Sequence, residues 1–363
     1  MAEDFGKKLL VEVEEVALDE VLETLRLQQG LQHDYFHLPH LDRLLRTTIE
    51  TRQHFSNKTR SSQPILEFTS TAPGAGKTQL LYHLAAIAVL PLSHGGNESC
   101  VVILDTDNSF SVPRLAQQIQ LLLTNQPGTE ADTSEPTTDT LALEALHHVH
   151  IFRPQSLTST IATLTSIPAY LFDKTRHYSF ERKVAFLAID SASAFHWQAK
   201  AAEETSILLS SDGDAGEQEP LHGYPQLALA LKSTIKTLHC LAILTSWYLG
   251  PIPTGDPHTA PSLRSSLPSP LSQLPTLRFL VRRVPVRKFP AGISIEEALR
   301  EAADRLRAVE ERRFECVVNE WDLEERVIGR LQRDGTVVRF RILAGGLVVE
   351  QDEERDGGDE VGM

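Results

Sequence analysis

A glycine-containing loop between an apolar strand and an apolar helix is the feature that most constrains this fold. Residues 64–68 read Pro-Ile-Leu-Glu-Phe, and the spacing of apolar residues predicts a helix from residue 77 onward. The connection ends in Gly76, Lys77 and Thr78, the last three positions of the pattern G-x-x-x-x-G-K-[ST]. Small residues let backbone N–H groups turn inward around phosphates, while the lysine reaches the β- and γ-oxygens and the hydroxyl contacts Mg²⁺. We therefore predict a loop that binds a nucleoside triphosphate, made of Thr71, Ala72, Pro73, Gly74, Ala75, Gly76, Lys77 and Thr78.

One position departs from the pattern. Thr71 stands where the first glycine is expected. Gly74 is interpreted as restoring some of the backbone freedom that this first glycine normally supplies.

Composition limits the classes of protein that the chain can belong to. Its 363 residues are 41% hydrophobic, which is typical of a globular protein with a sizeable core. The formal net charge of −14 disfavours a protein that holds nucleic acid by electrostatics alone. Three cysteines lie far apart in strand-like runs, as expected of buried thiols in a reducing compartment rather than of a zinc site. No signal peptide or membrane span is expected, because Met1–Lys8 lacks the required pattern and the longest apolar run is short.

Strands and helices alternate along the chain, which predicts an α/β fold with a mostly parallel sheet covered by helices on both faces. Antiparallel strands are expected at the C-terminal end, because residues 337–343 and 347–349 flank Ala344-Gly345-Gly346, a hairpin signal. The expected strands are 64–69, 100–105, 184–190 and 241–244, and the expected helices are 77–90 and 113–123.

Domain limits follow from changes in composition. Residues 1–60 are predicted to form a helical N-terminal lead-in, and residues 61–350 the core. Polar or Pro- and Ser-rich stretches at about 125–139, 203–221 and 251–275 are interpreted as flexible insertions. Residues 351–363 are predicted to be an acidic, disordered tail.

An acidic residue at the end of a buried strand is needed to hold Mg²⁺ opposite the threonine of the loop. Asp190 ends the apolar run 184–189 and meets this requirement, so Thr78 and Asp190 are the predicted metal ligands. The alternative is an aspartate that only caps the following helix.

A third group is needed to orient the attacking water, and Asp105-Thr106-Asp107 ends the strand at 100–105. At this point the chain resembles the RecA recombinase superfamily, in which the corresponding strand ends in Asp-Thr-Glu and the glutamate polarises water. Asp107 occupies that position with a side chain one methylene shorter. Lys77 and Asp107 are therefore the predicted catalytic residues, and we expect slow ATP hydrolysis or none.

The resemblance extends over most of residues 64–350 and is closest to the small eukaryotic RecA paralogs. It rests on Ile65-Leu66-Glu67-Phe68, on the run from Gly76 to Leu84, on Asp105-Thr106-Asp107, on Ile189-Asp190-Ser191-Ala192-Ser193-Ala194-Phe195-His196-Trp197 and on Phe340-Arg341-Ile342-Leu343. It implies a RecA-like ATPase core that uses ATP and Mg²⁺. It also implies a nuclear role in homologous-recombination repair of DNA double-strand breaks, within a complex of recombinase paralogs that assists the recombinase on single-stranded DNA. By the same resemblance, a separate helical N-terminal DNA-binding domain is not expected.

Residues 245–247 differ from the family at a position that links the bound nucleotide to DNA binding. Family members carry Thr-Asn-Gln here, and the glutamine senses the γ-phosphate, whereas this chain has Thr245-Ser246-Trp247. Trp247 lacks the amide, so it either covers the core, which we favour, or stacks on a base.

Intrinsic DNA binding is not expected from the loop at 251–275, because Arg264 is its only basic residue. A basic group just beyond it is available to a phosphate backbone, and part of it, residues 282–288, fits either an import signal or a basic edge strand. The group is Arg278, Arg282, Arg283, Arg287 and Lys288.

Two other functions use the same loop. A small-molecule phosphotransferase usually adds an arginine-bearing lid, and no compact segment of that kind follows Asp190. A non-hydrolysing scaffold in the repair complex is the other alternative.

Overall fold

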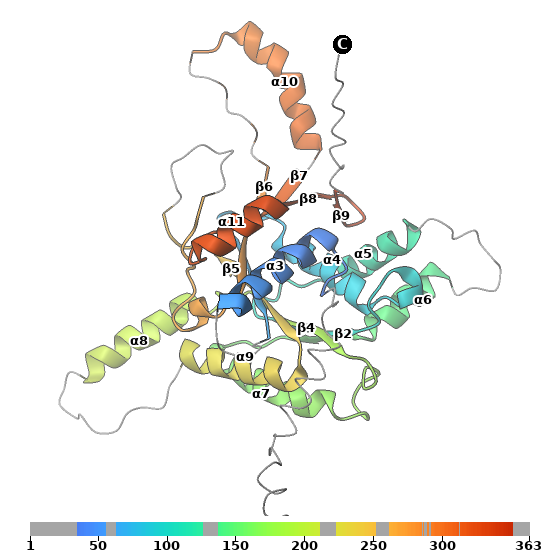
Figure 1. Cartoon of the computed structure of the whole chain (residues 1–363), viewed down its shortest axis with the longest axis vertical. Coiled ribbons are helices and arrows are strands. Elements are labelled where there is room, and N and C mark those ends of the chain that lie inside the picture. Colours follow the sequence, from blue (N-terminus) through green and yellow to red (C-terminus); the bar gives the residue numbers. More distant parts are fainter. Residues whose placement is uncertain are drawn as a thin grey trace, which may run out of the picture.

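The computed structural model describes residues 35–55, 63–125, 137–210, 223–251 and 261–350, apart from single positions at 285, 287, 288, 290, 291 and 312. These residues form a nine-stranded sheet in the order β3-β2-β4-β5-β1-β6-β7-β8-β9, flanked by helices (Figure 1). The strands from β3 to β6 in this order are parallel, and β7, β8 and β9 continue the sheet antiparallel. The predicted fold class is confirmed.

The bounds of the elements are as follows. The parallel strands are β1 (Ile65–Ser70), β2 (Cys100–Asp105), β3 (Val149–Phe152), β4 (Val184–Asp190), β5 (Leu241–Trp247) and β6 (Leu277–Arg283). The antiparallel strands are β7 (Arg313–Val318), β8 (Val337–Ile342) and β9 (Leu347–Val349). The helices are α3 (Pro39–Phe55), α4 (Lys77–Val89), α5 (Val112–Thr124), α6 (Thr138–Leu146), α7 (Leu157–Leu171), α8 (His196–Ser210), α9 (Tyr224–Leu238), α10 (Ile295–Glu310) and α11 (Glu325–Asp334). Two short 3₁₀ turns are η2 (Leu92–His94) and η3 (Leu271–Gln273).

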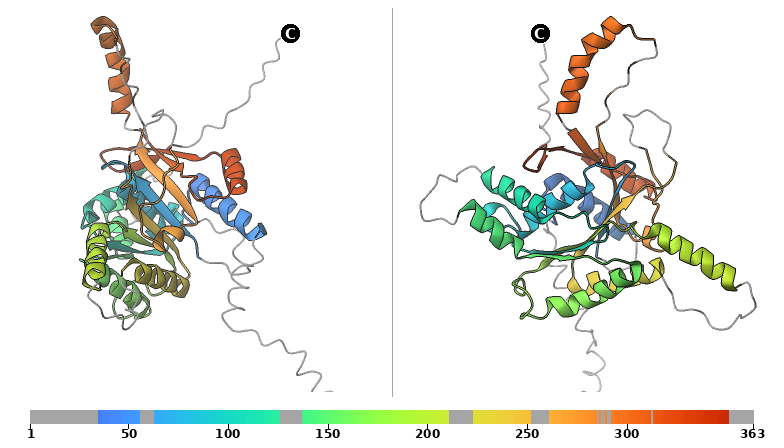
Figure 2. Two further views of the ribbon diagram at one scale, coloured as in Figure 1. Left: turned by 90° about the vertical axis from the view of Figure 1, so that its left-hand side faces the viewer. Right: turned by 180° about the vertical axis from the view of Figure 1, so that it is seen from behind.

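Helices cover the two faces of the sheet with separate hydrophobic cores. One core joins the sheet to α3, α4, α5, α6 and α11, and the other joins it to α7, α9 and η3. Strands β1 and β2 are buried along their whole length, as expected of parallel strands with helices on both sides. By contrast, α8 and α10 project away from this body (Figure 2).

Helix α4 is buried almost all round, because it lies between the sheet and neighbouring helices on the same face. Its sequence carries apolar residues on every side, so its burial does not depend on a single apolar stripe. The helix therefore holds the loop that precedes it in a fixed position at the edge of the sheet.

The three expected insertions differ in part from the structure. Residues 203–210 continue α8, so the segment at 203–221 is helical where it begins. Residues 263–271 pack into the core through three buried leucines spaced four residues apart, Leu263, Leu267 and Leu271, so the insertion at 251–275 is shorter than expected. The prediction was wrong there because Pro and Ser dominate the composition, while the leucines decide the packing. Most of 125–139, the tail at 351–363 and the lead-in before residue 35 lie outside the described residues; α3 is helical, as expected.

A buried ion pair ties β1 to β6. The Arg278 Nε donates to Glu67 Oε2 at 3.2 Å, and the two side chains are only 2% and 1% exposed. The other Glu67 oxygen accepts from Ser246 Oγ of β5 at 2.7 Å and from Ser265 Oγ at 3.0 Å. The guanidinium also donates to the Ser272 carbonyl oxygen. Every part of this pair is therefore hydrogen-bonded, as a buried charge requires.

The structure changes two interpretations of the basic residues. Arg278 was considered available to a DNA backbone, but it is enclosed in the protein and paired with Glu67. Strand β6 lies between β1 and β7, so Arg282 and Arg283 are not on an edge strand. Arg287 and Lys288 lie outside the described residues.

We expect Arg278→Met to lower the free energy of unfolding by about 3–5 kcal/mol, because it leaves Glu67 as an uncompensated buried charge. The double variant Glu67→Gln/Arg278→Met removes both charges and should be less damaging than the single one. Urea unfolding followed by circular dichroism measures both.

Arg176→Ala is the matched control, since it breaks an exposed pair with Asp173, and its effect should stay within about 0.5 kcal/mol. Equal stability of Arg278→Met and Arg176→Ala would show that the buried pair does not stabilise the sheet.

Candidate functional site

The candidate site lies at the carboxyl edge of the parallel strands. In the sheet register, Asp105 at the end of β2 is opposite Asp190 at the end of β4, and Ser70 at the end of β1 is opposite Trp247 at the end of β5. Because parallel strands end at one edge, residues far apart in sequence meet above it. The loop at 71–76 leaves β1 at this edge and leads into α4.

Two glycines give the loop its shape. Gly74 has φ +66° and Gly76 has φ +101°, a left-handed region that favours glycine. Thr71 does not take a positive φ, so the threonine is compatible with this loop and the needed freedom resides at Gly74 and Gly76. Gly76 is the N-cap of α4, and a helix N-terminus presents free N–H groups to an anion.

Gly76 also packs closely against β8. A Cβ atom at this position would lie 3.2 Å from Ile342 Cδ1 and 3.2 Å from Phe340 Cε2. Both side chains belong to Phe340-Arg341-Ile342-Leu343, one of the runs on which the family resemblance rests. The C-terminal strands therefore support the phosphate loop from outside.

Lys77 is the buried cation of the site. Its side chain is 8% exposed, and its Nζ donates to Ser70 Oγ and lies 4.1 Å from the centroid of the Trp247 ring. Burial lowers the pKa of this ammonium to about 8, although the carboxylates of Asp190 and Asp107 act in the opposite direction. A cation in this setting gains from an anionic ligand, which restores the electrostatic stabilisation that water normally provides.

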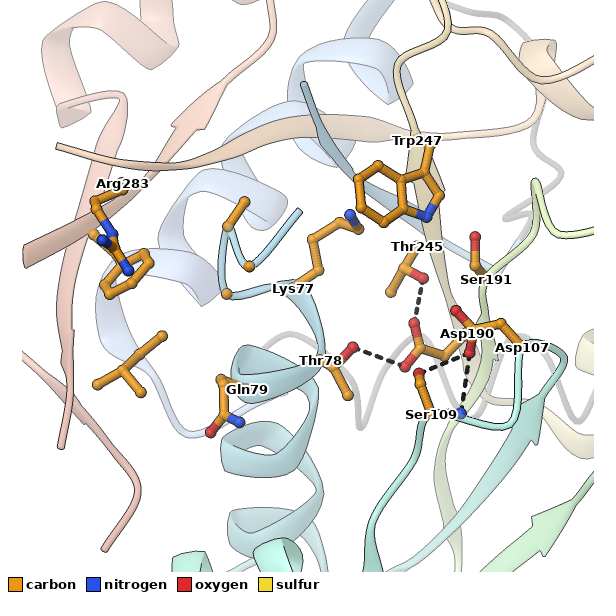
Figure 3. A pocket seen from close by; sticks show the side chains of 15 residues that line it. Lys77, Thr78, Gln79, Asp107, Ser109, Asp190, Ser191, Thr245, Trp247 and Arg283 are labelled. Carbon is orange, nitrogen blue, oxygen red and sulfur yellow. Dashed lines mark hydrogen bonds between the residues drawn. The ribbon is translucent and has the colours of Figure 1, made fainter. Parts of the chain in front are cut away.

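Thr78 and Asp190 lie together as predicted. The Thr78 hydroxyl donates to Asp190 Oδ2 at 3.1 Å, and the Thr245 hydroxyl donates to Asp190 Oδ1 at 2.5 Å (Figure 3). Burial raises the pKa of Asp190, and the nearby carboxylate of Asp107 raises it further, against the lowering effects of both hydroxyls and of Lys77. Two oxygen ligands at the end of the phosphate loop match the preference of Mg²⁺, which keeps water as its other ligands.

Asp105 and Asp107 have different environments although they are two residues apart. Asp105 is buried, pairs with Arg153 Nε at 3.2 Å and accepts from the Ser109 amide at 2.9 Å. Asp107 is exposed, faces the cleft and accepts from Ser109 Oγ at 2.7 Å. Asp105 is thus a structural residue, and Asp107 is the carboxylate that a water molecule can reach.

A cleft of about 450 Å³ joins these side chains. On the side formed by the C-terminal strands, the cleft is lined by Arg283 at the end of β6, Phe314 of β7 and Ile342 of β8. The sequence did not predict these three residues as part of the site. The Arg283 guanidinium lies 5.2 Å from the centre of the Phe314 ring. Only the antiparallel pairing of β6 with β7 brings the two together, and no local sequence signal reports it.

Trp247 does not simply cover the core, which was the interpretation favoured from the sequence, while stacking on a base stays a prediction. It is half buried, it lines the cleft and it covers Lys77, so it is not a residue of the hydrophobic core. Figure 3 shows its ring beside the lysine head, above Thr245 and Asp190.

The residues present fit a nucleotide with its metal. The cleft has a buried cation, a helix N-terminus approached through left-handed glycines, and a hydroxyl next to a strand-end carboxylate. Phosphates match the first two features, and Mg²⁺ matches the third. Of the predicted residues, Gly74, Ala75, Gly76, Lys77, Thr78, Asp107 and Asp190 line the cleft, whereas Thr71, Ala72 and Pro73 do not.

The fold and this site define a class, the P-loop proteins with a RecA-like core. No protein-family model matches the chain. The mouse protein "DNA repair protein XRCC2" is 29% identical over 136 residues, which cover 38% of this chain and 42% of that protein. The mouse and human proteins "DNA repair protein RAD51 homolog 2" are each 44% identical over 45 residues, 12% of this chain and 13% and 12% of their own lengths.

The chain therefore spans less than half of the length of each of these relatives. With the fold and the loop, the matches show that the chain resembles the RecA/RAD51 paralogs, XRCC2 among them. Among the residues that the structure describes, no helix has the length and apolar character needed to cross a membrane.

We expect Gly76→Ala to lower the free energy of unfolding by about 1–3 kcal/mol, because alanine must adopt φ +101° and press on Phe340 and Ile342. Thermal or urea unfolding of the purified chain measures the change.

Gly329→Ala is the control within α11, where a Cβ meets no atom within 4 Å. That variant should be neutral or up to about 1 kcal/mol more stable, because alanine favours a helix. If both variants unfold at the same denaturant concentration, the left-handed geometry of the loop is not needed for stability.

Proposed function

We propose that this chain binds ATP with Mg²⁺ and acts in the repair of DNA double-strand breaks by homologous recombination. In this proposal it works as a subunit of a recombinase-paralog complex that assists the recombinase on single-stranded DNA. The observation that carries the nucleotide part is the arrangement of Lys77, Thr78 and Asp190 around one cleft. The relatives, which are named as DNA repair proteins, support the repair part.

Each side chain has a defined task in this proposal. Lys77 neutralises phosphate charge, and the backbone from Gly74 to Lys77 cradles the phosphates. Thr78 and Asp190 hold Mg²⁺, which neutralises charge on the phosphate oxygens. Asp107 orients water, but it is one methylene shorter than a glutamate, and a misplacement of about an ångström can cost roughly a hundredfold in rate. Slow turnover follows.

Contact with DNA is proposed to be shared with partners. The formal net charge is −14, and Arg278 is buried in an ion pair, so this chain offers a weaker basic surface than its sequence suggested. We also propose a nuclear location, as expected of a protein that acts on DNA, and the free, buried cysteines Cys100, Cys240 and Cys316 are compatible with that compartment.

We expect Lys77→Ala to weaken Mg-ATP binding by at least about tenfold, because a charge-assisted contact to phosphate contributes roughly 1.5–3 kcal/mol. Asp190→Asn should remove the dependence of binding on Mg²⁺. Isothermal titration of the full chain with and without Mg²⁺ measures both effects.

The matched controls are Lys232→Ala, an exposed lysine on α9, and Asp304→Asn, whose side chain is 77% exposed on α10. Both should bind like the wild type. Unchanged ATP binding by Lys77→Ala would contradict the nucleotide site.

The repair part is tested by purifying the tagged chain from its own cells after DNA damage. RecA-family paralogs should co-purify, and deletion of the gene should make cells sensitive to double-strand breaks. Recovery of metabolic enzymes alone, with normal break repair in the deletion strain, would contradict a role in recombination. If the Lys77→Ala variant repairs breaks fully and its complex stays intact, the chain acts in repair as a scaffold that does not need a nucleotide.

A further inference from the structure

Trp247 is fixed by the register of the sheet beside the lysine of the loop. It is opposite Ser70 in the pairing of β5 with β1, and the two residues contact the same ammonium. Ser70 accepts a hydrogen bond from Lys77 Nζ, and the indole ring lies 4.1 Å from this atom. Tryptophan is the aromatic side chain with the strongest attraction for a cation, and desolvation strengthens that attraction.

The backbone at Trp247 is held on both sides. Its N–H donates to Ser193 Oγ at 3.0 Å, and this hydroxyl is in turn paired with Ser191 Oγ at 2.9 Å. The next amide, that of Tyr248, donates to the Ser70 carbonyl oxygen at 2.9 Å. Any adjustment to a ligand must therefore come from rotation of the indole and not from movement of the strand.

The ring stands on the side of the cleft where a terminal phosphate belongs. A P-loop holds the inner phosphates with the backbone at the helix N-terminus, and the terminal phosphate faces the metal ligand and the water-orienting residue. In this site the metal ligand is Asp190, at the end of β4, and the water-orienting residue is Asp107, two residues after the end of β2. Trp247 ends β5, which pairs directly with β4.

The Trp247 indole and a terminal phosphate therefore compete for contact with the Lys77 ammonium. A diphosphate is held mainly by the N–H groups of the loop and needs Lys77 only in part, whereas a third phosphate lies beyond the loop and depends on Lys77 more strongly. A third phosphate can contact the Lys77 ammonium directly only if the indole ring rotates away from it. The contact with Trp247 thus opposes triphosphate binding more strongly than diphosphate binding.

We propose that Trp247 determines the phosphate specificity of this site: its ring competes with a terminal phosphate for Lys77 and biases the site toward a nucleoside diphosphate over a triphosphate. This inference rests on the proposed nucleotide binding. The chain then holds a nucleotide mainly in its diphosphate form, and the indole reports which form is bound.

The test compares the affinities of the full chain for Mg-ADP and for Mg-AMP-PNP, a triphosphate that is not hydrolysed, by isothermal titration. Trp247→Leu removes the aromatic face, and the ratio of the two affinities should move toward the triphosphate by about tenfold. That change corresponds to about 1.4 kcal/mol, within the range of a partly desolvated cation–π contact. Trp247→Phe keeps a weaker aromatic face and should give an intermediate ratio, so the test survives if the leucine variant folds poorly.

Trp197→Leu is the matched control, because Trp197 is 62% exposed on α8 and does not line the cleft. It should keep the wild-type ratio. In a Trp197→Phe/Trp321→Phe background, Trp247 is the only tryptophan, and its fluorescence should change more with Mg-AMP-PNP than with Mg-ADP.

The outcomes separate the two proposals. If neither nucleotide binds the wild-type chain, the proposed nucleotide site is wrong. If both bind in a Lys77-dependent manner but the Trp247 variants keep the wild-type ratio within twofold, only the specificity inference is overturned.

Discussion

The parallel pairing of β1 with β5 is the constraint on which the candidate site depends. It sets Ser70 opposite Trp247, so that one hydroxyl and one indole ring enclose the ammonium of Lys77. The same strand pairs with β6 on its other side, where Glu67 and Arg278 form the buried ion pair. A shift of one residue in either register would reverse which side chains face each helix layer, so the phosphate loop and the core are fixed together.

Burial shifts the pKa values of the two charged groups of the site in opposite directions. It lowers the pKa of the Lys77 ammonium and raises the pKa of the Asp190 carboxyl, so each group is pushed toward its neutral form. A phosphate beside Lys77 and a divalent cation beside Asp190 would reverse both effects. The site is therefore complementary to a nucleotide together with its metal. A phosphate favours the charged form of Lys77, and a divalent cation favours the charged form of Asp190.

The sequence predicted the parts of the fold and site that local patterns determine. Thr78 follows a recognisable loop, and Asp190 ends a continuous apolar strand, so their meeting at one edge follows from parallel topology alone. The partner of Arg278 is 211 positions away, at Glu67, and no local signal distinguishes this buried arginine from its exposed neighbours. Similarly, Leu263, Leu267 and Leu271 lie in a Pro- and Ser-rich stretch whose composition hides their burial. Long-range packing decides these cases, and composition does not report it.

Two of the departures from the family pattern, Asp107 and Trp247, line the same cleft. Gly76, Lys77 and Thr78 keep the residue types that hold inner phosphates and metal, and positive φ at Gly74 and Gly76 makes glycine unnecessary at Thr71. At Asp107 and Trp247, by contrast, the family's glutamate and glutamine are replaced. A loss of the whole site would scatter changes over the loop as well. Changes at these two cleft-lining positions, with the loop lysine and threonine kept, are the pattern that the proposed nucleotide binding with slow turnover requires.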